Sequence, residues 1–315
     1  MLDAPTNADA PTNAVERTTF DSSAGRLRRM LAGGRALPAV GAYDALTARL
    51  VERAGFPVVH VGGYGLSAAQ LALPDVGYLT MTEMLESVRR ICAVVSLPVV
   101  ADGDTGYGNH LNADRLIREL ERAGAAAVHL EDQAFPKRCG HMDGKRLVPV
   151  QDMLDKVKAA ADARTDAQFL IIARTDAIAV DGFEAAIARG LAYREAGADM
   201  IFVEAPESDS QLREIPKRIP GLTLFNASWD GKSPLLSLDA LSAMGYRLVL
   251  YPDTIFAATR AVMRMLEDLA AHGQYTGRAD GFVGFHEFNE IVGLPRVQAL
   301  DARFGEREAP AKARG

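Results

Sequence analysis

Acidic residues close two apolar stretches of the chain, and carboxylates are the side chains that bind hard metal ions. Asp102 and Asp104 end one strand candidate, and Glu131 and Asp132 end the next. Carboxylates on neighbouring strand ends repel one another unless a cation lies among them, and oxygen ligands favour Mg2+ or Mn2+. An Asp-x-Asp pair also caps helices and turns, so Asp102 and Asp104 alone do not decide for a metal. Together with Glu131, the pattern predicts a divalent metal site.

A cysteine lies among basic residues shortly after these carboxylates, in the segment Lys137 to His141, which reads KRCGH. The surrounding stretch is rich in Gly, Pro and charge, so we interpret it as a loop. Basic neighbours favour the thiolate and make proton exchange near neutral pH feasible, which makes Cys139 a candidate catalytic residue rather than an incidental exposed thiol. The other cysteine, Cys92, lies in an apolar helical stretch and is interpreted as packing.

Apolar strand candidates alternate with amphipathic helical stretches from Gly33 onward. Strands separated by helices pair in parallel, and eight such units favour a closed (β/α)8 TIM barrel over the alternative, a doubly wound open sheet. Active sites of such barrels lie at the carboxyl ends of the strands, where the acidic residues are found. The eight strand candidates are Ala36 to Ala42, Val58 to Gly62, Val99 to Asp102, Ala126 to Glu131, Phe169 to Arg174, Met200 to Glu204, Thr223 to Asn226 and Arg247 to Tyr251.

The order and spacing of the motifs resemble those of the isocitrate lyase and phosphoenolpyruvate mutase superfamily over residues 26–304. The resemblance implies a (β/α)8 barrel whose last helix is exchanged between the subunits of a homotetramer, a dimer of dimers. The segment 281–315 follows the eighth unit as a helical extension that needs a surface to pack on. The motifs are Gly41 to Leu46 (GAYDAL), Leu73 to Gly77 (LPDVG), Asp102 to Asn109 (DGDTGYGN), Leu130 to Gln133 (LEDQ), Lys137 to His141, Ala173 to Ala177 (ARTDA) and Phe202 to Ala205 (FVEA).

The resemblance also implies roles for individual residues. Asp102 would bind Mg2+ directly, while Asp104 and Glu131 would hold it largely through water. Arg174 would contact substrate oxygens together with Asn226, or would pair only with Asp176 at its strand end. Glu204 would orient Arg174 or neighbouring polar groups. The remaining substrate-binding positions by this resemblance are Tyr43, Gly62, Gly63, Tyr64 and Asp75.

In the lyases of this family, a 2-hydroxy acid loses its hydroxyl proton and its C2–C3 bond breaks. The products are a 2-oxo acid and a carboxylate enediolate, to which a cysteine delivers a proton. The matching residue here is Cys139, in a mobile loop that would close over the substrate, with Lys137 and His141 as further catalytic candidates. A divalent cation and Arg174 fixed at the developing charge stabilise the transition state more than the ground state. We therefore expect a Mg2+-dependent carbon–carbon lyase acting on a 2-alkylmalate or 2-methylisocitrate.

The loop after the second strand departs from the family. Relatives usually have Ser-Gly there, with the Ser hydroxyl and adjacent amides receiving a substrate carboxylate, whereas this chain reads GGYG from Gly62. The amides remain as a candidate anion nest, but the hydroxyl is absent. The tyrosine at position 64 resembles the branch that cleaves 2-alkylmalates and oxaloacetate. Farther along, Trp229, the only tryptophan, either lines the pocket or anchors a surface loop.

Three other functions stay open. Carboxyphosphonoenolpyruvate mutases of the superfamily carry the same KRCGH loop, so a phosphorus–carbon bond reaction is one of them, and oxaloacetate hydrolysis is another. The absence of Ser at position 62 motivates the third, a barrel that binds a carboxylate without turning it over. His60 and His129 lie inside strands and are interpreted as core groups, or as groups behind the metal ligands, rather than as metal ligands.

Composition limits the partners. The formal net charge is −6, and no basic stretch with interleaved aromatics occurs, which argues against nucleic acid. No apolar run approaches the length of a membrane span, and the N-terminus lacks the layout of a secretory signal, so we expect a cytoplasmic protein with no membrane partner. The sequence DAPTNA occurs twice within residues 1–25, which we expect to be a disordered leader ahead of a barrel domain at 26–280.

Overall fold

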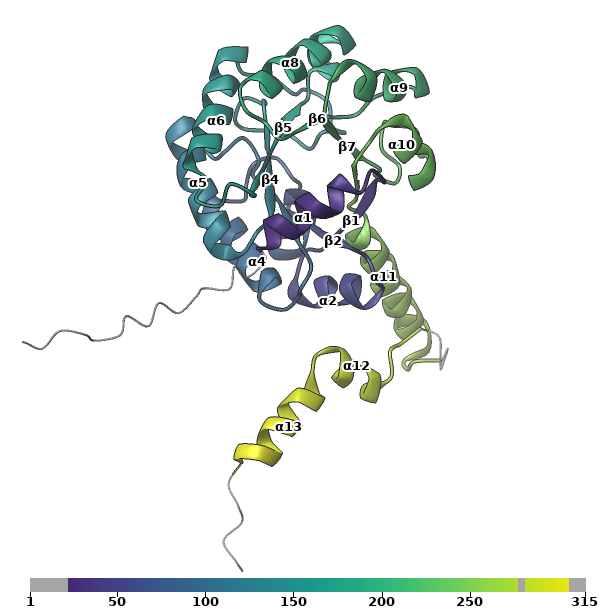
Figure 1. Cartoon of the computed structure of the whole chain (residues 1–315). Coiled ribbons are helices and arrows are strands. Elements are labelled where there is room, and N and C mark those ends of the chain that lie inside the picture. The colour runs from purple at the N-terminus through teal and green to yellow at the C-terminus, as the bar shows by residue number, and fades with distance from the viewer. Residues whose placement is uncertain (1–21, 277–280, 306–315) are drawn as a thin grey trace, which may run out of the picture.

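Eight parallel strands close into a barrel in the computed structural model, which describes residues 22–276 and 281–305 (Figure 1). Each strand pairs with the next one along the chain, and β1 pairs with β8 through contacts such as Leu37 with Leu248. The predicted (β/α)8 barrel is confirmed, and every predicted strand end lies within one residue of its observed position. The strands are β1 Leu37–Gly41, β2 Val58–Val61, β3 Val99–Asp102, β4 Ala127–Glu131, β5 Leu170–Thr175, β6 Met200–Val203, β7 Leu222–Asn226 and β8 Leu248–Tyr251.

Helices cover the outside of the barrel, so the strands are buried on both faces, as their continuous apolar runs require. Local signals set several helix ends: Thr80 and Glu83 form a capping box at the start of α4, and Gly124 ends α5 in the left-handed conformation. The barrel helices and turns are α2 Ala45–Arg53, α3 Gly63–Leu66, the π-helical turn η1 Ser67–Leu71, α4 Met81–Cys92, α5 His110–Ala123, α6 Val150–Ala163, α7 Ile178–Asp181, α8 Phe183–Glu195, α9 Asp209–Arg218 and α10 Leu238–Met244.

The helix α1 (Ser23–Ala32) lies across the end of the barrel where the strands begin. Arg28 on this helix donates to the carbonyls of Gln168 and Phe169, just before and at the start of β5, and pairs with Asp199 just before β6 at 2.8 Å. These contacts tie α1 to the amino end of the barrel. The opposite, carboxyl end is therefore the open one. The repeated segment at 1–21 lies outside the described residues, and α1 begins inside the range 1–25 expected as a leader.

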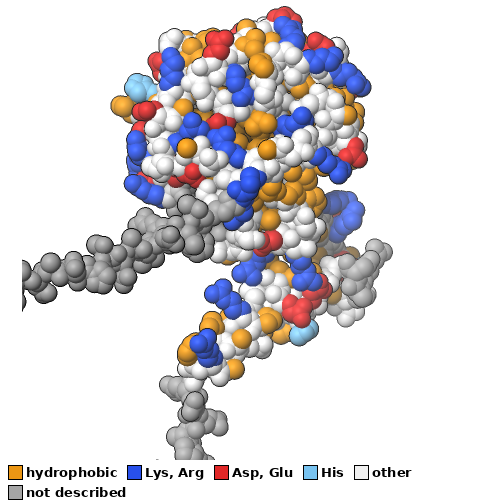
Figure 2. All heavy atoms as spheres, in the orientation of Figure 1, with side chains coloured by type: hydrophobic (Ala, Val, Ile, Leu, Met, Phe, Trp, Pro, Cys, Tyr) orange, Lys and Arg blue, Asp and Glu red, His pale blue; other side chains and the backbone are white. Residues whose placement is uncertain are grey.

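The C-terminal helices extend away from the barrel (Figure 1). They are α11 Thr254–His272, α12 Phe285–Ile291 and α13 Leu294–Phe304, and neither α11 nor α13 contains a buried residue. Figure 2 shows hydrophobic side chains on the surface of this C-terminal segment. Its contacts with the barrel include Arg49 donating to the carbonyl of Ile291 and Arg53 pairing with Glu287, both at 3.1 Å. Among residues 22–276 and 281–305, we find no helix with the length and apolar character needed to cross a bilayer.

Candidate active site at the carboxyl end of the barrel

A cavity of about 560 Å3 opens at the carboxyl end of the barrel. Residues at or just beyond the ends of all eight strands line it, so side chains far apart in the sequence converge there. All of the predicted site residues line this cavity except Asp104, which lies behind Lys137. The predicted residues in the lining are Tyr43, Gly62, Gly63, Tyr64, Asp75, Asp102, Glu131, Lys137, Cys139, His141, Arg174, Glu204 and Asn226.

Asp102 is held at the end of β3 by two backbone amides. The amide of Gly63 donates to its Oδ2 and the amide of Asp104 donates to its Oδ1, each at 2.9 Å. Burial acts to raise the pKa of Asp102, but His129, Lys137 and the Gly63 amide together hold that pKa below its ordinary value. The carboxylate is therefore ionised at neutral pH. Because the Gly63 amide is already engaged, it is not a free member of the anion nest expected there.

The cation among the neighbouring carboxylates is Lys137. Its Nζ lies 2.6 Å from both Asp75 and Asp104, and its side chain is 4% exposed. Burial raises the pKa of Asp104 to about 6, with Lys137 opposing the shift and Asp102 adding to it. Glu131, farther from the ammonium group, has its pKa raised well above the ordinary value by burial, against the opposing charge of Arg174. Lys137 thus neutralises part of the charge that the sequence assigned to a metal ion alone.

The residues present fit a magnesium ion of limited protein coordination. Within the described residues, no group of three or more His, Cys, Asp and Glu side chains is arranged to hold a metal. Mg2+ commonly binds one or two carboxylates and keeps several waters. Asp102 lines the cavity, and Glu131 Oε1 is buried without a hydrogen-bond partner. This geometry suits direct binding by Asp102 with water between the ion and the other carboxylates, and it does not suit a cage of three carboxylates.

Asp132, the fourth carboxylate of the sequence clusters, points away from the cavity. It accepts from Thr175 at 2.7 Å and from the hydroxyl of Tyr193 at 2.8 Å, and it pairs with Arg189 at 3.3 Å. Consecutive strand residues face opposite sides, so Glu131 faces the barrel interior and Asp132 faces the helices. Asp132 is therefore a structural residue, and its grouping with the metal carboxylates was wrong.

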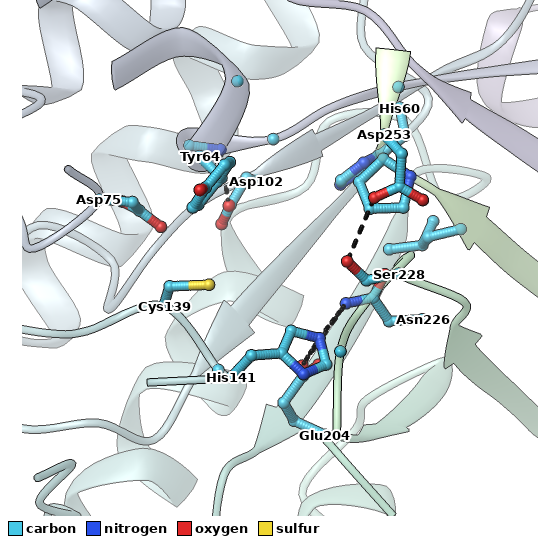
Figure 3. A pocket seen from close by; sticks show the side chains of 18 of the residues that line it. His60, Tyr64, Asp75, Asp102, Cys139, His141, Glu204, Asn226, Ser228 and Asp253 are labelled. Atoms are coloured by element: carbon cyan, nitrogen blue, oxygen red, sulfur yellow. Dashed lines mark hydrogen bonds and ion pairs between the residues drawn. The ribbon is translucent and has the colours of Figure 1, made fainter. Parts of the chain in front are cut away.

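The KRCGH loop lies over the cavity, and Figure 3 shows the sulfur of Cys139 directed into it. The backbone amide of Cys139 donates to the carbonyl of Asp75 at 3.1 Å. Burial raises the pKa of the Cys139 thiol to about 11, and Asp75 and Glu204 add to the shift. The predicted thiolate is wrong, because the charges of Lys137 and Arg138 are used elsewhere: Lys137 pairs with carboxylates, and Arg138 donates to the carbonyl of Asp143. Cys139 carries its proton at neutral pH.

Arg174 projects from β5 into the cavity and is fixed from behind. Its Nε and Nη2 donate to the two oxygens of Asp176 at 2.9 and 3.1 Å, and its guanidinium lies 5.0 Å from the ring centre of Phe202. Its Nη1 lies 3.8 Å from Glu204. The pairing with Asp176, which the sequence left as an alternative to substrate contact, is present, and it leaves Arg174 in the cavity lining. A guanidinium held in this way is a preorganised partner for a carboxylate.

Glu204, at the end of β6, connects three of the predicted residues. Its Oε1 lies 3.3 Å from Nε2 of His141 and accepts from Nδ2 of Asn226 at 3.5 Å, and its Oε2 faces Arg174 (Figure 3). The glutamate is 1% exposed. A buried carboxylate with these contacts positions polar groups from three different loops around one side of the cavity.

Other cavity residues escaped the sequence analysis. Asp253 follows β8, accepts from Ser228 at 3.2 Å and from the amide of Trp229 at 2.9 Å, and so fixes the loop after β7 (Figure 3). Its position just beyond the end of the eighth strand was a signal that could have found it. Trp229 lines the cavity but is 69% exposed, so it lies at the rim. Tyr64 packs against Phe256 of α11, with ring centres 5.5 Å apart.

The family follows from comparison with known proteins. A sequence model described as phosphoenolpyruvate phosphomutase matches residues 27–270. This chain belongs to the phosphoenolpyruvate mutase family. Among curated relatives, a 2,3-dimethylmalate lyase of Eubacterium barkeri is 43% identical over 90% of this chain and 98% of its own length. A 2-methylisocitrate lyase of Aeropyrum pernix is 39% identical over 91% and 93%.

A third curated relative of this family member is the chloroplastic carboxyvinyl-carboxyphosphonate phosphorylmutase of Arabidopsis thaliana, 44% identical over 84% of this chain and 79% of its own. Solved structures are equally similar in fold. Oxaloacetate acetylhydrolase with 3,3-difluorooxalacetate superposes with a TM-score of 0.86 at 32% identity, covering 91% of this chain and 99% of its own. Phosphonopyruvate hydrolase in complex with oxalate and Mg2+ gives 0.80 at 32% identity over 90% and 100%.

Proposed function

We propose that this protein is a Mg2+-dependent carbon–carbon lyase that cleaves a 2-hydroxy dicarboxylate or tricarboxylate, of the 2-alkylmalate or 2-methylisocitrate type. The observation that carries the proposal is a protonated cysteine, Cys139, facing the same cavity as the fixed guanidinium of Arg174 and the ionised carboxylate of Asp102. A thiol is a proton donor, a guanidinium binds a carboxylate, and a carboxylate binds a divalent cation. The lyases among the relatives support this choice.

In this proposal, Arg174 and Asn226 bind substrate carboxylate oxygens, and Glu204 holds both in place. The substrate hydroxyl gives up its proton, the C2–C3 bond breaks, and C2 becomes the carbonyl of a 2-oxo acid. The electron pair of the broken bond passes to C3 and its carboxylate. Cys139 then donates its thiol proton to C3, and the thiolate regains the proton lost by the hydroxyl by way of solvent. No net oxidation or reduction takes place.

Each residue has a physical reason for its part. Arg174 is fixed by Asp176, so no reorganisation is needed when negative charge grows on the substrate carboxylate. Mg2+ bound at Asp102 would supply Lewis-acid stabilisation of oxygen charge. The loop that carries Cys139 covers the cavity and excludes water that would otherwise protonate the carbanion equivalent.

The direct test is release of a 2-oxo acid from a panel of 2-alkylmalates and 2-methylisocitrate, with and without EDTA. We expect pyruvate or glyoxylate from at least one compound, loss of product with EDTA, and recovery with added Mg2+. Cys139→Ser should lower turnover by about 100-fold or more while Mg2+ affinity stays unchanged. Saturable Mg2+ binding with no product from any compound would favour the alternative, a barrel that binds a carboxylate without turnover.

A phosphorus–carbon mutase is the second candidate, because a phosphorylmutase is 44% identical to this chain. Both reactions use a covered cavity with a cation and a fixed guanidinium, so the KRCGH loop does not separate them. Oxaloacetate hydrolysis has the same standing through the acetylhydrolase fold. Incubation with carboxyphosphonoenolpyruvate followed by 31P NMR, and with oxaloacetate followed by oxalate detection, distinguishes these reactions from alkylmalate cleavage.

We also propose that the protein forms a homotetramer in which the C-terminal helices pack on another subunit, as the sequence predicts. The support is an apolar set on α12 and α13 that has little to pack against within the chain. Phe285 is 87% exposed and Phe304 69%, and Leu294, Val297 and Leu300 are also exposed. Multi-angle light scattering of the full chain and of a chain ending at residue 276 tests this: we expect a tetramer from the first and a smaller species from the second.

A further inference from the structure

Gly62, the residue that departs from the family pattern, lies against the ring of His60. A Cβ added to Gly62 would lie 2.9 Å from Cε1 of His60, well inside normal carbon–carbon contact. The ring has no free direction in which to move, because Nε2 of His60 lies 3.1 Å from Nε2 of His129 and the two rings stack with centres 5.3 Å apart. Glycine at position 62 therefore makes room for the histidine at position 60.

The two histidines share one hydrogen between their Nε2 atoms, and the surroundings decide which ring donates it. Nδ1 of His129 lies 3.4 Å from Oδ1 of Asp102. A protonated Nδ1 is attracted to that carboxylate, whereas an unprotonated one is repelled. With its hydrogen on Nδ1, the neutral His129 has a bare Nε2, which accepts the hydrogen bond donated by Nε2–H of His60.

The other end of the pair agrees with this assignment. Nδ1 of His60 is buried and has no hydrogen-bond partner, and in this arrangement it carries no hydrogen. A buried acceptor without a partner is tolerated better than a buried N–H without one. The reverse arrangement would leave an unpaired N–H on His60 and turn a lone pair of His129 toward Asp102. Burial, followed by the effect of His129, lowers the pKa of His60 to about 3, so the ring is neutral.

We propose that His60 is a positioning residue for Asp102, acting through His129, and that Gly62 is required to accommodate it. His60 fixes the tautomer and orientation of His129, whose Nδ1–H then steadies the carboxylate assigned to Mg2+. The inference rests on the metal site of the proposed function but not on the reaction. Two backbone amides also hold Asp102, so removal of His60 should loosen the metal site rather than abolish it.

The test is metal affinity in the full chain, measured without substrate. Mg2+ binding by isothermal titration calorimetry and Mn2+ binding by electron paramagnetic resonance are compared for the wild type, His60→Phe and His60→Gln. His60→Phe keeps a flat ring but has no N–H, and its Kd should rise about 10- to 100-fold. His60→Gln keeps a donor toward His129, and its Kd should stay within about threefold of the wild type. A purely structural role would lower the Tm of both variants without this order of affinities.

Gly62→Ser supplies an independent variant should His60→Phe fail to fold. The added side chain displaces the ring of His60, so metal affinity should fall as in His60→Phe. In a His60→Ala background, Gly62→Ser should cause no further loss, because the ring it displaces is absent. The proposal is overturned by wild-type affinity in His60→Phe, by equal weakening in His60→Gln, or by independent effects of the changes at positions 60 and 62.

Two results separate this inference from the proposed function. A wild-type chain that binds Mg2+ but cleaves no 2-hydroxy acid removes the lyase proposal and leaves the role of His60 to be decided by the affinities. A wild-type chain that binds neither Mg2+ nor Mn2+ overturns the inference, because Asp102 then has no ion to hold.

Discussion

Gly140→Ala tests whether the loop position over the cavity is the catalytic one. Gly140 does not adopt a left-handed backbone, so alanine meets no conformational barrier there. Its added Cβ would lie 2.5 Å from Nη2 of Arg174 and 2.5 Å from both Cγ and Oε1 of Glu204. Those distances are about 1 Å shorter than normal contacts.

The loop, not the groups it contacts, must yield. Arg174 is held by two hydrogen bonds to Asp176, and Glu204 is buried beside it. A displacement of about 1 Å would move Cys139 away from the substrate, and a misplacement of that size typically costs about 100-fold in rate. We expect kcat/KM for the cleaved 2-hydroxy acid to fall about 100-fold. The unfolding free energy should change by less than about 1 kcal/mol, because the loop contributes little to the barrel core.

The assay is steady-state release of 2-oxo acid, with thermal unfolding measured in parallel. Gly284→Ala is a matched control, since its backbone is ordinary and its Cβ would meet no atom within 4 Å among the described residues. That variant should keep wild-type kinetics. Wild-type kcat/KM in Gly140→Ala would show that catalysis does not need the loop in this position, and the role given to Cys139 would lose its geometric basis.

Three further outcomes are expected. Lys137→Met leaves two buried carboxylates without their cation and should lower the unfolding free energy by about 3–5 kcal/mol in urea without Mg2+; a loss below about 1 kcal/mol would contradict the pairing. Asp132→Asn should destabilise the protein by about 1–3 kcal/mol yet leave KM and Mg2+ affinity unchanged, and an altered affinity would place Asp132 in the site after all. The raised pKa of Cys139 keeps the thiol protonated until the pH passes about 11, so in a Cys92→Ala background iodoacetamide at pH 8 should react at least about tenfold more slowly than with a model peptide thiol; equal rates would indicate a thiolate.

The fold was largely predictable because it repeats one local pattern. Each buried strand is an uninterrupted apolar run, and signals such as the glycine at 124 mark where helices end. The function of α1 was not predictable in the same way. Arg28 reaches carbonyls about 140 residues away in the sequence, and no local pattern reports such a contact.

The site was predictable as a set of positions but not as a charge distribution. Strand ends gather at one mouth of the barrel, which brought Asp102, Glu131, Arg174 and Glu204 together as expected. The state of Cys139 was mistaken because residues adjacent in the sequence point in different directions in space. The two-residue alternation of strands would have separated Glu131 from Asp132 had it been applied at that point.

Deuterium incorporation tests most directly whether Cys139 delivers a proton to the carbon released by bond cleavage. The protein is incubated in D2O with Mg2+ and a 2-alkylmalate or 2-methylisocitrate that it cleaves, and the carboxylate product is analysed by NMR. The lyase mechanism proposed here predicts one deuterium at C3, added to a single face, from the wild type, and a large loss of product from Cys139→Ser. Deuterium on both faces, or equal turnover by the two proteins, would contradict it.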